Sequence, residues 1–337
     1  MSCSLLLRDR VDPLVEPGVI GTSHLHQIVG GNSFRANMTP ITHDPATESA
    51  CTTCTLPDDF SNYWTATMFY QSPHNGSYKR IKQIGSLFHE KAREGGITIY
   101  YFPQYMDLDG RSTNKVRLRA FAPGFRMRTG HPNNNQQYPG TPWRDPSATR
   151  TLMDGIVYTC LQREDTRFTH LGYEFPGVPC PEGILTTIFF PPCWDGKNLD
   201  SPDHSSHVAY VMDGDYMRGA ACPASHPVII PQIALEIRWD TREFNAEEFW
   251  PVTKGRQPFL WSFGDRKGFG HHGDYLFGWK GDSLQKAFDC VGCGAQGGLP
   301  GQSIEAANEC RGTPQVEEDV DGWLETMPGG VVGRAWE

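Results

Sequence analysis

Short runs in which hydrophobic and polar residues alternate recur along the chain and predict β-strands. The clearest are residues 97–102, 155–160 and 234–239. Alternation with a period of two places one set of side chains on a core and the other set on the opposite face of a sheet. Similar runs are residues 116–121, 186–190, 207–210 and 258–262. Because most runs follow one another too closely for a crossover helix between them, we expect antiparallel pairing.

Helical patterns are few. Residues 282–288 predict a short helix with Asp282 as its N-cap, and residues 81–91 predict one or two helical turns. Residues 131–147 are polar and predict a long loop. This balance favours a mainly β protein: a single-domain antiparallel β-sandwich of jelly-roll-like type, with long ordered loops and a few short helices.

The chain shows no stretch with the composition of an interdomain linker, so we expect residues 1–311 to form one β-rich domain. Residues 312–337 are acidic and rich in glycine, with Glu317, Glu318 and Asp319 in a row. We expect this tail to lie on the surface or to be disordered, because it has little hydrophobic surface to bury.

The charge balance narrows the choice of partners. The chain has 30 basic and 39 acidic residues, a formal net charge of −9. A nucleic-acid-binding surface needs a basic footprint, so we expect no nucleic-acid partner. No apolar run approaches the roughly 20 residues of a membrane span, so we expect no membrane insertion. The chain is expected to be a monomer.

Ten cysteines are spread along the chain. An even number in a loop-rich chain favours disulfides formed in an oxidising compartment, and hence secretion. Cys51 and Cys54, like Cys290 and Cys293, also have the spacing of zinc ligands, so a cytosolic zinc protein is the rival interpretation. Only three leucines precede Arg8, too few for a signal peptide, and we therefore expect a leader that was removed or truncated.

Histidines gather in three short segments, each beside glycine, serine or aspartate. The groups of interest in them are His24 and His26; Asp203, His204 and His207; and His271, His272 and Asp274. Imidazole carries protons near neutral pH and is a common metal ligand. If the fold brings the three segments together, they form one polar site with several titratable groups.

Each segment allows a chemical and a structural interpretation. His24 and His26 lie two positions apart, so in a strand they share a face, as two metal ligands would; the alternative is a pair of packed histidines beside a turn. Asp203 beside His204 suits a general base or an oriented metal ligand, because a carboxylate raises the pKa of an imidazole and fixes its tautomer. The alternative there is a solvated loop whose aspartates and serines make turns.

Aromatic residues suggest where a substrate could bind. Tyr275 and Trp279 follow the His272–Asp274 pair, and Trp194 precedes the 203–207 segment. Such rings stack on sugar rings in binding clefts and are equally common in cores. Arg126 could pair with an acidic sugar or occupy a surface strand position. Another histidine, His226, is a weaker candidate, because a histidine at such a position is more often packed in a loop.

Established motifs are missing from the chain: it has no Gly-x-Ser-x-Gly, no His-Glu-x-x-His, no phosphate loop and no dinucleotide fingerprint. Residues 23–31, Ser-His-Leu-His-Gln-Ile-Val-Gly-Gly, instead resemble the Ser-His-Val-His-x-x-x-Gly-Gly opening of a secreted fungal family that also occurs in bacteria. That family is known only as a domain of unknown function, number nineteen-ninety-six. Further similar segments are 193–204, 206–210, 222–227 and 272–279.

The resemblance covers nearly the whole chain, from about Cys3 to residues 321–323. It marks the histidines and aspartates above as motif positions, apart from His271, which falls at a variable position. Family members typically carry a signal peptide and are sometimes joined to carbohydrate-binding or wall-sensing modules, which implies a polysaccharide setting by analogy. Sequons at Asn37 and Asn75 would fit a secreted glycoprotein.

Two functions from different classes therefore remain. The first is a secreted hydrolase or lyase acting on cell-wall or extracellular polysaccharide. Its acid and base would come from the second and third histidine segments, and His24 and His26 would hold a divalent metal ion. The proposed catalytic residues are Asp203, His204, His207, His272 and Asp274. The alternative is a non-catalytic carbohydrate- or wall-binding module with a structural metal site.

Overall fold

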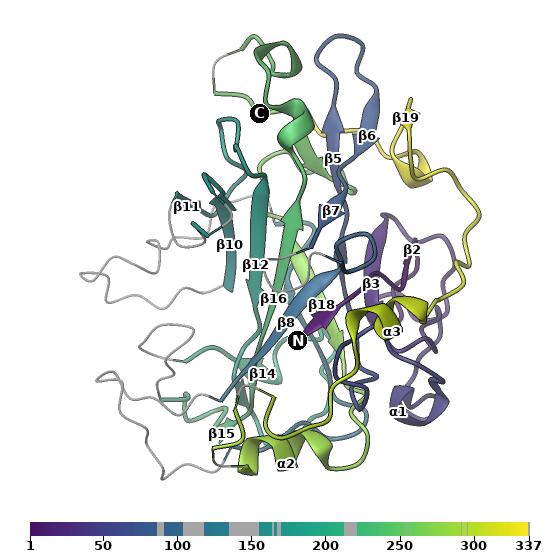
Figure 1. Ribbon diagram of the computed structural model, residues 1–337, viewed down its shortest axis with the longest axis vertical. Coiled ribbons are helices and arrows are strands. Elements are labelled where there is room, and N and C mark those ends of the chain that lie inside the picture. Colours follow the sequence, from purple (N-terminus) through teal and green to yellow (C-terminus); the bar gives the residue numbers. More distant parts are fainter. Residues whose placement is uncertain are drawn as a thin grey trace.

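The chain folds into a mainly β protein, as its alternating pattern predicts (Figure 1). The computed structural model describes residues 1–85, 91–103, 118–134, 155–163, 165–166, 170–211, 221–253, 255–290, 292–294 and 296–335. Most of its secondary structure belongs to antiparallel sheets, and the helices are short.

The largest sheet contains seven strands. They are β1 (Ser2–Cys3), β7 (Gln83–Ile84), β8 (Ile97–Phe102), β10 (Gly155–Cys160), β11 (Leu171–Gly172), β12 (Ile184–Phe189) and β16 (Gln232–Trp239). Their order is β1-β8-β16-β12-β10-β11, with β7 also paired to β16. The four long central strands carry the β-branched and aromatic residues typical of a sheet buried on its inner face.

A second sheet contains five strands and carries the candidate site. They are, in spatial order, β2 (Leu7–Asp9), β3 (His26–Gly30), β4 (Asn62–Ala66), β18 (His272–Leu276) and β9 (Arg126–Gly130). All four pairings are antiparallel. Segments that are far apart in the sequence thus lie side by side.

These two sheets pack face to face in a sandwich-like arrangement. A Cβ atom added to Gly273 of β18 would lie 3.1 Å from the Ile188 side chain of β12. The Tyr275 and Phe190 rings are 6.4 Å apart across the same interface. The buried side chains between the sheets form the main hydrophobic core.

The outer face of the five-stranded sheet is also covered. Ile28, Trp64 and Leu276 project from it into a second hydrophobic cluster, where Leu14 and Met38 of the N-terminal loops pack on them. The polar side chains on this face are therefore buried beneath loops. This cover decides how accessible the candidate site is.

Two smaller sheets and several short helices complete the fold. The strands are β5 (Met68–Gln71), β6 (Tyr78–Arg80), β17 (Phe259–Trp261) and β19 (Trp323–Leu324) in one sheet, and β13 (Cys193–Trp194), β14 (Val208–Ala209) and β15 (Val228–Ile229) in the other. The helices are α1 (Pro45–Glu48), α2 (Ser283–Asp289), α3 (Ile304–Glu309), η1 (Arg242–Phe244), η2 (Glu247–Phe249) and η3 (Pro328–Gly330). In the part of the chain that the structure describes, no helix is both long and apolar enough to span a membrane.

All ten cysteines form disulfides, which confirms the disulfides predicted from the sequence. The pairs are Cys3–Cys54, Cys51–Cys310, Cys160–Cys180, Cys193–Cys222 and Cys290–Cys293. Cys51 and Cys54 therefore bind two different partners and are not zinc ligands, which removes the cysteine-based evidence for a cytosolic zinc protein. The Cys51–Cys310 bond ties the C-terminal part of the chain to its beginning.

Several predicted elements lie within two residues of the expected bounds, whereas the predictions at 81–91 and 116–121 do not hold in the described residues. The runs 97–102 and 155–160 coincide with β8 and β10, and the predicted helix at 282–288 is shifted by one residue in α2. The helix predicted at 81–91 is wrong at its start, because Gln83 and Ile84 pair with β16 as β7; residues 86–90 lie outside the described residues. Residues 118–121 of the predicted strand 116–121 are irregular, and the rest of it is likewise not described.

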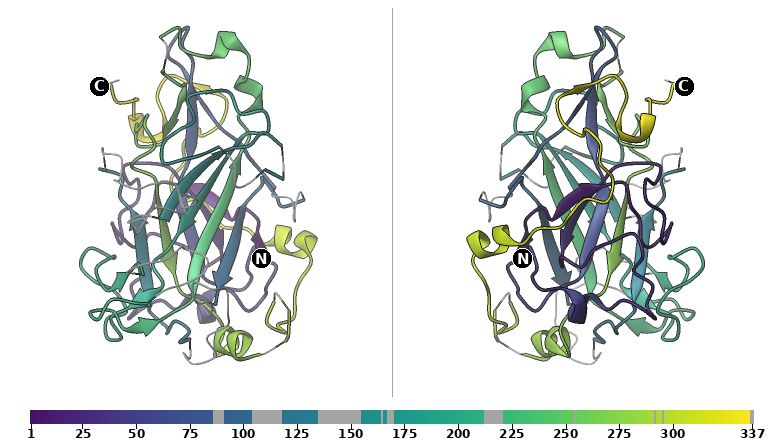
Figure 2. Two further views of the ribbon diagram at one scale, coloured as in Figure 1. Left: turned by 90° about the vertical axis from the view of Figure 1, so that its left-hand side faces the viewer. Right: turned by 90° about the vertical axis from the view of Figure 1, so that its right-hand side faces the viewer.

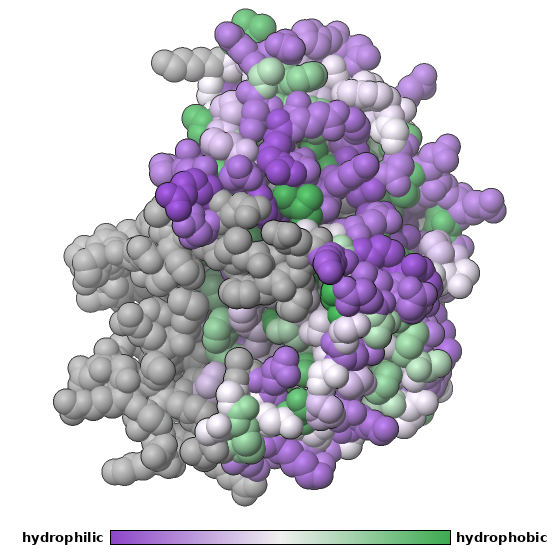
Figure 3. Space-filling model, in the orientation of Figure 1, coloured by the Kyte–Doolittle hydropathy of each residue, from purple (hydrophilic) through white to green (hydrophobic). Residues whose placement is uncertain are grey.

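The tail that follows Cys310 lies along the surface. In Figure 1 its chain runs from α3 along one edge of the molecule to β19, which pairs with β6. Figure 2 shows α2 at one end of the molecule and α3 beside the N-terminus. On the face in Figure 3 the described residues are mainly hydrophilic, and hydrophobic side chains appear only in small groups. Of the loop predicted at 131–147, residues 131–134 form a turn and the remainder lies outside the described residues.

Candidate functional site

The outer face of the five-stranded sheet carries a row of polar residues. The strand register places Trp64, Asp274 and Arg128 directly opposite one another on β4, β18 and β9. His272 lies two residues before Asp274, so the two side chains lie on the same face of the sheet. His26, the first residue of β3, lies on that face as well. The polar row is thus a direct result of the pairing register.

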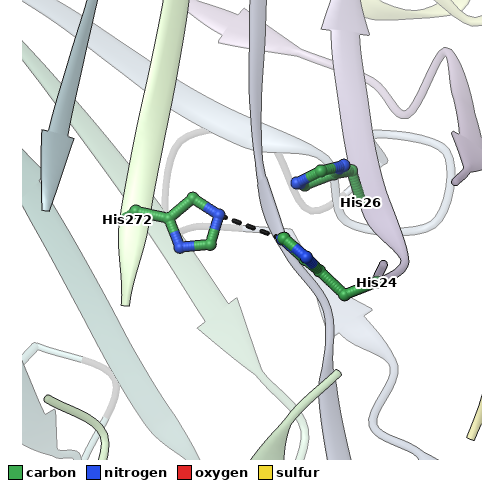
Figure 4. A group of neighbouring side chains, drawn as sticks. All are labelled: His24, His26 and His272. Atoms are coloured by element: carbon green, nitrogen blue, oxygen red, sulfur yellow. Dashed lines mark hydrogen bonds between the residues drawn. The ribbon is translucent and has the colours of Figure 1, made fainter. Parts of the chain in front are cut away.

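Three histidines meet at one end of this row. His24 precedes β3, His26 is its first residue, and His272 is the first residue of β18 (Figure 4). The His24 and His272 Nε2 atoms are 3.1 Å apart, and one ring nitrogen of each of the three side chains lies within 4.8 Å of the others. The three side chains are 6 %, 0 % and 2 % exposed, in that order. We call these residues the histidine trio.

Backbone carbonyls orient two rings of the trio. The His26 Nδ1–H donates to the Val11 carbonyl over 3.1 Å, and the His272 Nδ1–H donates to the Gly270 carbonyl over 3.0 Å. A carbonyl only accepts hydrogen bonds, so the Nε2 atom of each ring keeps its lone pair. The His26 Nε2 atom is buried and has no hydrogen-bond partner among the described residues. Metal-binding histidines in proteins are commonly held by carbonyls in this way.

Burial keeps the trio neutral. Loss of solvent lowers the pKa of His26 to about 4 and that of His272 to about 3. It also holds the pKa of His24 well below its usual range, and the two neighbouring imidazoles add to that effect. A neutral imidazole is the form that binds a metal ion.

Two buried carboxyl groups and an arginine border the trio. Burial raises the pKa of Asp12 and that of Asp274, and the neighbouring Asp12 raises the pKa of Asp274 further. The neighbouring Arg128 lowers the pKa of both acids, and His272 lowers that of Asp12. Neither Asp274 carboxyl oxygen, nor the Arg128 Nε atom, has a hydrogen-bond partner within the described part of the chain. Asp12 accepts from the amides of Leu14 and Val15, at 3.0 and 2.9 Å.

The 203–207 segment docks on the neighbouring edge strand, β9, and not in the trio. The Arg128 amide donates to the His204 carbonyl at 2.8 Å, and the His207 Nε2–H donates to the Arg126 carbonyl at 2.9 Å. His204 Nδ1 lies 2.7 Å from an Asp200 carboxylate oxygen. The segment therefore stands one strand away from His272, with the Arg128 side chain between the two regions.

Asp203 stabilises a turn. Burial raises its pKa, but hydrogen bonds from the Ser206 amide, the Ser201 hydroxyl and the Ser205 amide outweigh that effect and lower the pKa. One Asp203 oxygen accepts all three of these hydrogen bonds. The structural interpretation of this loop is thus realised, because its acid and serines close a turn on β9.

Two other histidines lie apart from the trio. His271 points to the opposite face of the sheet, where its ring stacks on Trp261 with centroids 3.8 Å apart. His226 lies 2.9 Å from the Ser206 carbonyl through Nε2 and so braces the 203–207 segment. Neither side chain belongs to the histidine trio.

The predicted substrate-binding residues are buried. Tyr275 and Trp279 both hydrogen-bond to the Tyr101 hydroxyl, at 3.2 and 3.0 Å. Trp194 Nε1 donates to the Asn198 carbonyl at 2.6 Å. Arg126 is buried, and its Nη1 donates to the Met38 carbonyl at 3.0 Å. None of these four side chains presents an exposed face to a glycan in this conformation.

Sequence reasoning missed two charged residues beside the trio. Asp12 has no signal beyond an aspartate in a turn before Pro13, and Arg128 occupies an ordinary strand position. It also treated His272 as an acid–base residue and left it out of the metal pair. Strand spacing could have indicated that His272 and Asp274 share a face, but not which other strand lies beside them.

The comparisons with known proteins add one finding. A family model described as "Domain of unknown function (DUF1996)" matches residues 12–279, which include the trio, Asp12 and Asp274. No curated protein and no solved structure matches the chain. The function must therefore be inferred from the site.

Proposed function

The chain belongs to the DUF1996 family, and from its site we propose that it is an extracellular protein that acts on polysaccharide with the help of a divalent metal ion bound by His24, His26 and His272. The proposed reaction is hydrolysis or lyase cleavage. Five disulfides fit an extracellular setting.

The observation that carries this proposal is the convergence of three neutral imidazoles. Metal–nitrogen bonds of about 2.0–2.1 Å in a tetrahedral site place ligand nitrogens about 3.3 Å apart. The trio's ligand atoms, which lie within 4.8 Å of one another, would need only small side-chain shifts to reach that geometry. Ser23 Oγ lies 3.0 Å from His24 Nδ1 and can accept a hydrogen bond from the Nδ1–H tautomer, in which the His24 Nε2 lone pair is available to the metal.

The charge distribution also supports a dication. Two acids, Asp12 and Asp274, are buried beside the trio with Arg128 as their nearby cation. Burial disfavours the charged form of both carboxyl groups, and a dication at the trio would stabilise them as carboxylates. Asp274 can accept hydrogen bonds from a metal-bound water, since both of its oxygens lack protein partners.

Three protein ligands also suit a catalytic role. Catalytic zinc sites typically use three protein ligands and keep a fourth position for water or substrate. A metal-bound water at neutral pH supplies a nucleophile or a base for cleavage of a glycosidic bond. The assignment of polysaccharide as the substrate rests on the family resemblance.

Burial of the trio favours a second candidate, a non-catalytic carbohydrate-binding protein with a structural ion. The most exposed member, His24, is only 6 % exposed. A polymer would reach the metal only if the covering loops moved. The two candidates share the metal site and differ in turnover.

Metal content and activity together test the proposal. Purified protein is analysed for bound metals, next to His272→Ala and the control His226→Ala, whose ring lies in the 203–207 region. We expect about one transition-metal ion per chain in the wild type and in the control, and loss of it in His272→Ala. Reducing-sugar release or new ultraviolet absorbance on a panel of wall polysaccharides then separates enzyme from binding module. Absence of metal would overturn both candidates, and metal without turnover would leave the second.

A further inference from the structure

We infer that residues 315–334, here called the C-terminal strap, position His24 and His26 and close the metal site against solvent. The inference rests on the proposed metal binding at the trio. The strap makes three contacts. Two reach the segment that carries these two histidines, and the third reaches Phe263, whose ring lies against His24 and His272.

The first contact holds the chain that leads into His24. Asp9 accepts hydrogen bonds from the amides of Gln315 and Val316, at 2.5 and 3.1 Å. The Arg10 Nε–H donates to Glu318 at 2.6 Å, with both side chains mostly buried. Arg10 in turn donates through Nη1 to the Thr22 carbonyl at 2.6 Å, and its own carbonyl accepts from the Thr22 amide at 2.7 Å. The strap is thus connected to the residue two positions before His24.

The second contact lies directly behind the two histidines. Leu25 stands between them in the chain and is fully buried. It shares a hydrophobic cluster with Met327 of the strap, together with Tyr78 and Leu260. Because Leu25 is the residue between the two histidines, packing its side chain here holds the backbone from which both imidazoles project.

The third contact covers the trio. The Phe263 ring lies 5.2 Å from the His24 ring and 5.5 Å from the His272 ring, centroid to centroid, and it is only partly buried. The Arg334 guanidinium lies 5.8 Å from the Phe263 centroid on the strap side. The Arg334 amide also donates to the Gly264 carbonyl at 2.9 Å. The end of the strap therefore holds the ring that shields two of the three ligands.

The strap is not part of the family match. The model of the family ends at residue 279, whereas all three histidines lie within it. The strap therefore covers a site whose three proposed ligands all lie within the matched residues. The expected consequence is slow exchange of the metal ion, since the cover has to open before a chelator or a substrate reaches the site.

The test measures how fast metal leaves. Protein loaded with Co²⁺ is mixed with excess chelator, and the loss of the Co²⁺ absorption bands gives the release rate. We expect the double variant Met327→Ala with Arg334→Ala to release metal at least tenfold faster than the wild type. Met327→Leu, which keeps the packing volume, should restore the slow rate to within about twofold when Arg334 is retained. Val332→Ala, an exposed position on the same strap, is the matched control and should not change the rate.

General destabilisation is controlled for separately. Leu235→Ala creates a cavity in β16, in the other large sheet, and should lower the thermal midpoint without speeding metal release. Arg334→Ala alone, a change at the surface, keeps the test usable if the double variant does not fold. Wild-type release rates in the folded strap variants would overturn the strap inference while leaving the metal site intact. A wild type that binds no Co²⁺ would overturn the proposed function itself, and with it this inference.

Discussion

At the residue scale, the orientation of each histidine follows from the group that holds its Nδ1 atom. Val11 and Gly270 contribute carbonyls to His26 and His272, and these hydrogen bonds leave both Nε2 atoms as acceptors. The 203–207 segment shows the opposite arrangement, because His207 Nε2 already bonds to the Arg126 carbonyl. Similar side chains thus form the proposed ligand set in one place and stabilise a loop in another.

Asp274→Asn should weaken metal binding by about 10- to 100-fold, the usual cost of losing a partner beside the ligands. The variant keeps the shape of the side chain and removes a negative charge that a dication would offset. Competition with a chelator of known affinity measures the change. Asp203→Asn is the control, since that carboxylate stabilises a turn on β9 and should leave the metal affinity unchanged. An unaltered affinity in Asp274→Asn would contradict a role for this acid at the metal.

Asp59 makes a pH prediction that is independent of the trio. Burial raises the pKa of this carboxyl to about 6, although hydrogen bonds from Tyr63 and Ser61 lower it. The folded state therefore holds this proton up to a higher pH than the unfolded state. The resulting stabilisation is complete below about pH 4 and is lost as the pH rises to about 6. Two pKa units correspond to about 3 kcal/mol.

Asp59→Asn removes that titration. We expect the free energy of unfolding of the variant, relative to the wild type, to shift in favour of the variant by about 3 kcal/mol between about pH 4 and pH 7. Urea unfolding at the two pH values measures this change, and comparing the shift cancels the constant cost of altering the Tyr63 hydrogen bond. A difference that does not depend on pH would show that Asp59 has no raised pKa.

At the scale of elements, the register of antiparallel strands assembles the site. Trp64, Asp274 and Arg128 lie side by side on one face of the sheet, because β18 pairs with β4 on one side and with β9 on the other. The inner face of β18 must at the same time fit against β12, and the two sheets approach closely at Gly273. One face of β18 therefore carries residues of the site, and its other face packs against the neighbouring sheet.

Gly273→Ala should destabilise the protein by about 1–3 kcal/mol, the usual cost of overpacking a core. Its new Cβ atom would lie 3.1 and 3.2 Å from two carbons of the Ile188 side chain, which would have to move away by a few tenths of an ångström. Gly177→Ala is the control, because no atom lies within 4 Å of the added Cβ there. Urea denaturation of both variants gives the comparison, and equal stabilities would show that the interface is loosely packed.

At the scale of the whole molecule, covalent links and the strap join the ends of the chain to its middle. Cys51–Cys310 bridges a separation of 259 residues, whereas Cys290–Cys293 bridges only 3. The C-terminal strap then continues from Cys310 across the chain that leads into the histidine trio. The site is thus held by segments from the beginning, the middle and the end of the chain.

Removing the long-range disulfide should cost more than removing the short one. Constraining a long loop removes more entropy from the unfolded chain, so the Cys51→Ser, Cys310→Ser double variant should lose about 2–4 kcal/mol. The Cys290→Ser, Cys293→Ser control should lose less, because its loop is short. Denaturation under non-reducing conditions gives both values, and the reverse order would contradict this account.

Much of the fold could be predicted from the sequence, because the signals for strands and disulfides are local. β8 and β10 have the expected bounds since alternation records which side chains face a core. The predictions failed where pairing with neighbouring strands determines the secondary structure. The pattern at residues 81–91 suits a helix, yet Gln83 and Ile84 complete the edge of a sheet.

The candidate site, too, could be predicted only in part. The sequence alone determined that His24, His26, His272 and Asp274 are chemically notable, because residue type and spacing are visible in it. Only the tertiary structure decided that His272 joins His24 across 248 positions, that Asp12 and Arg128 border them, and that the 203–207 segment stands one strand away. The physical reason is that strand order and register are set by packing across the whole molecule, and no local pattern records which strands become neighbours.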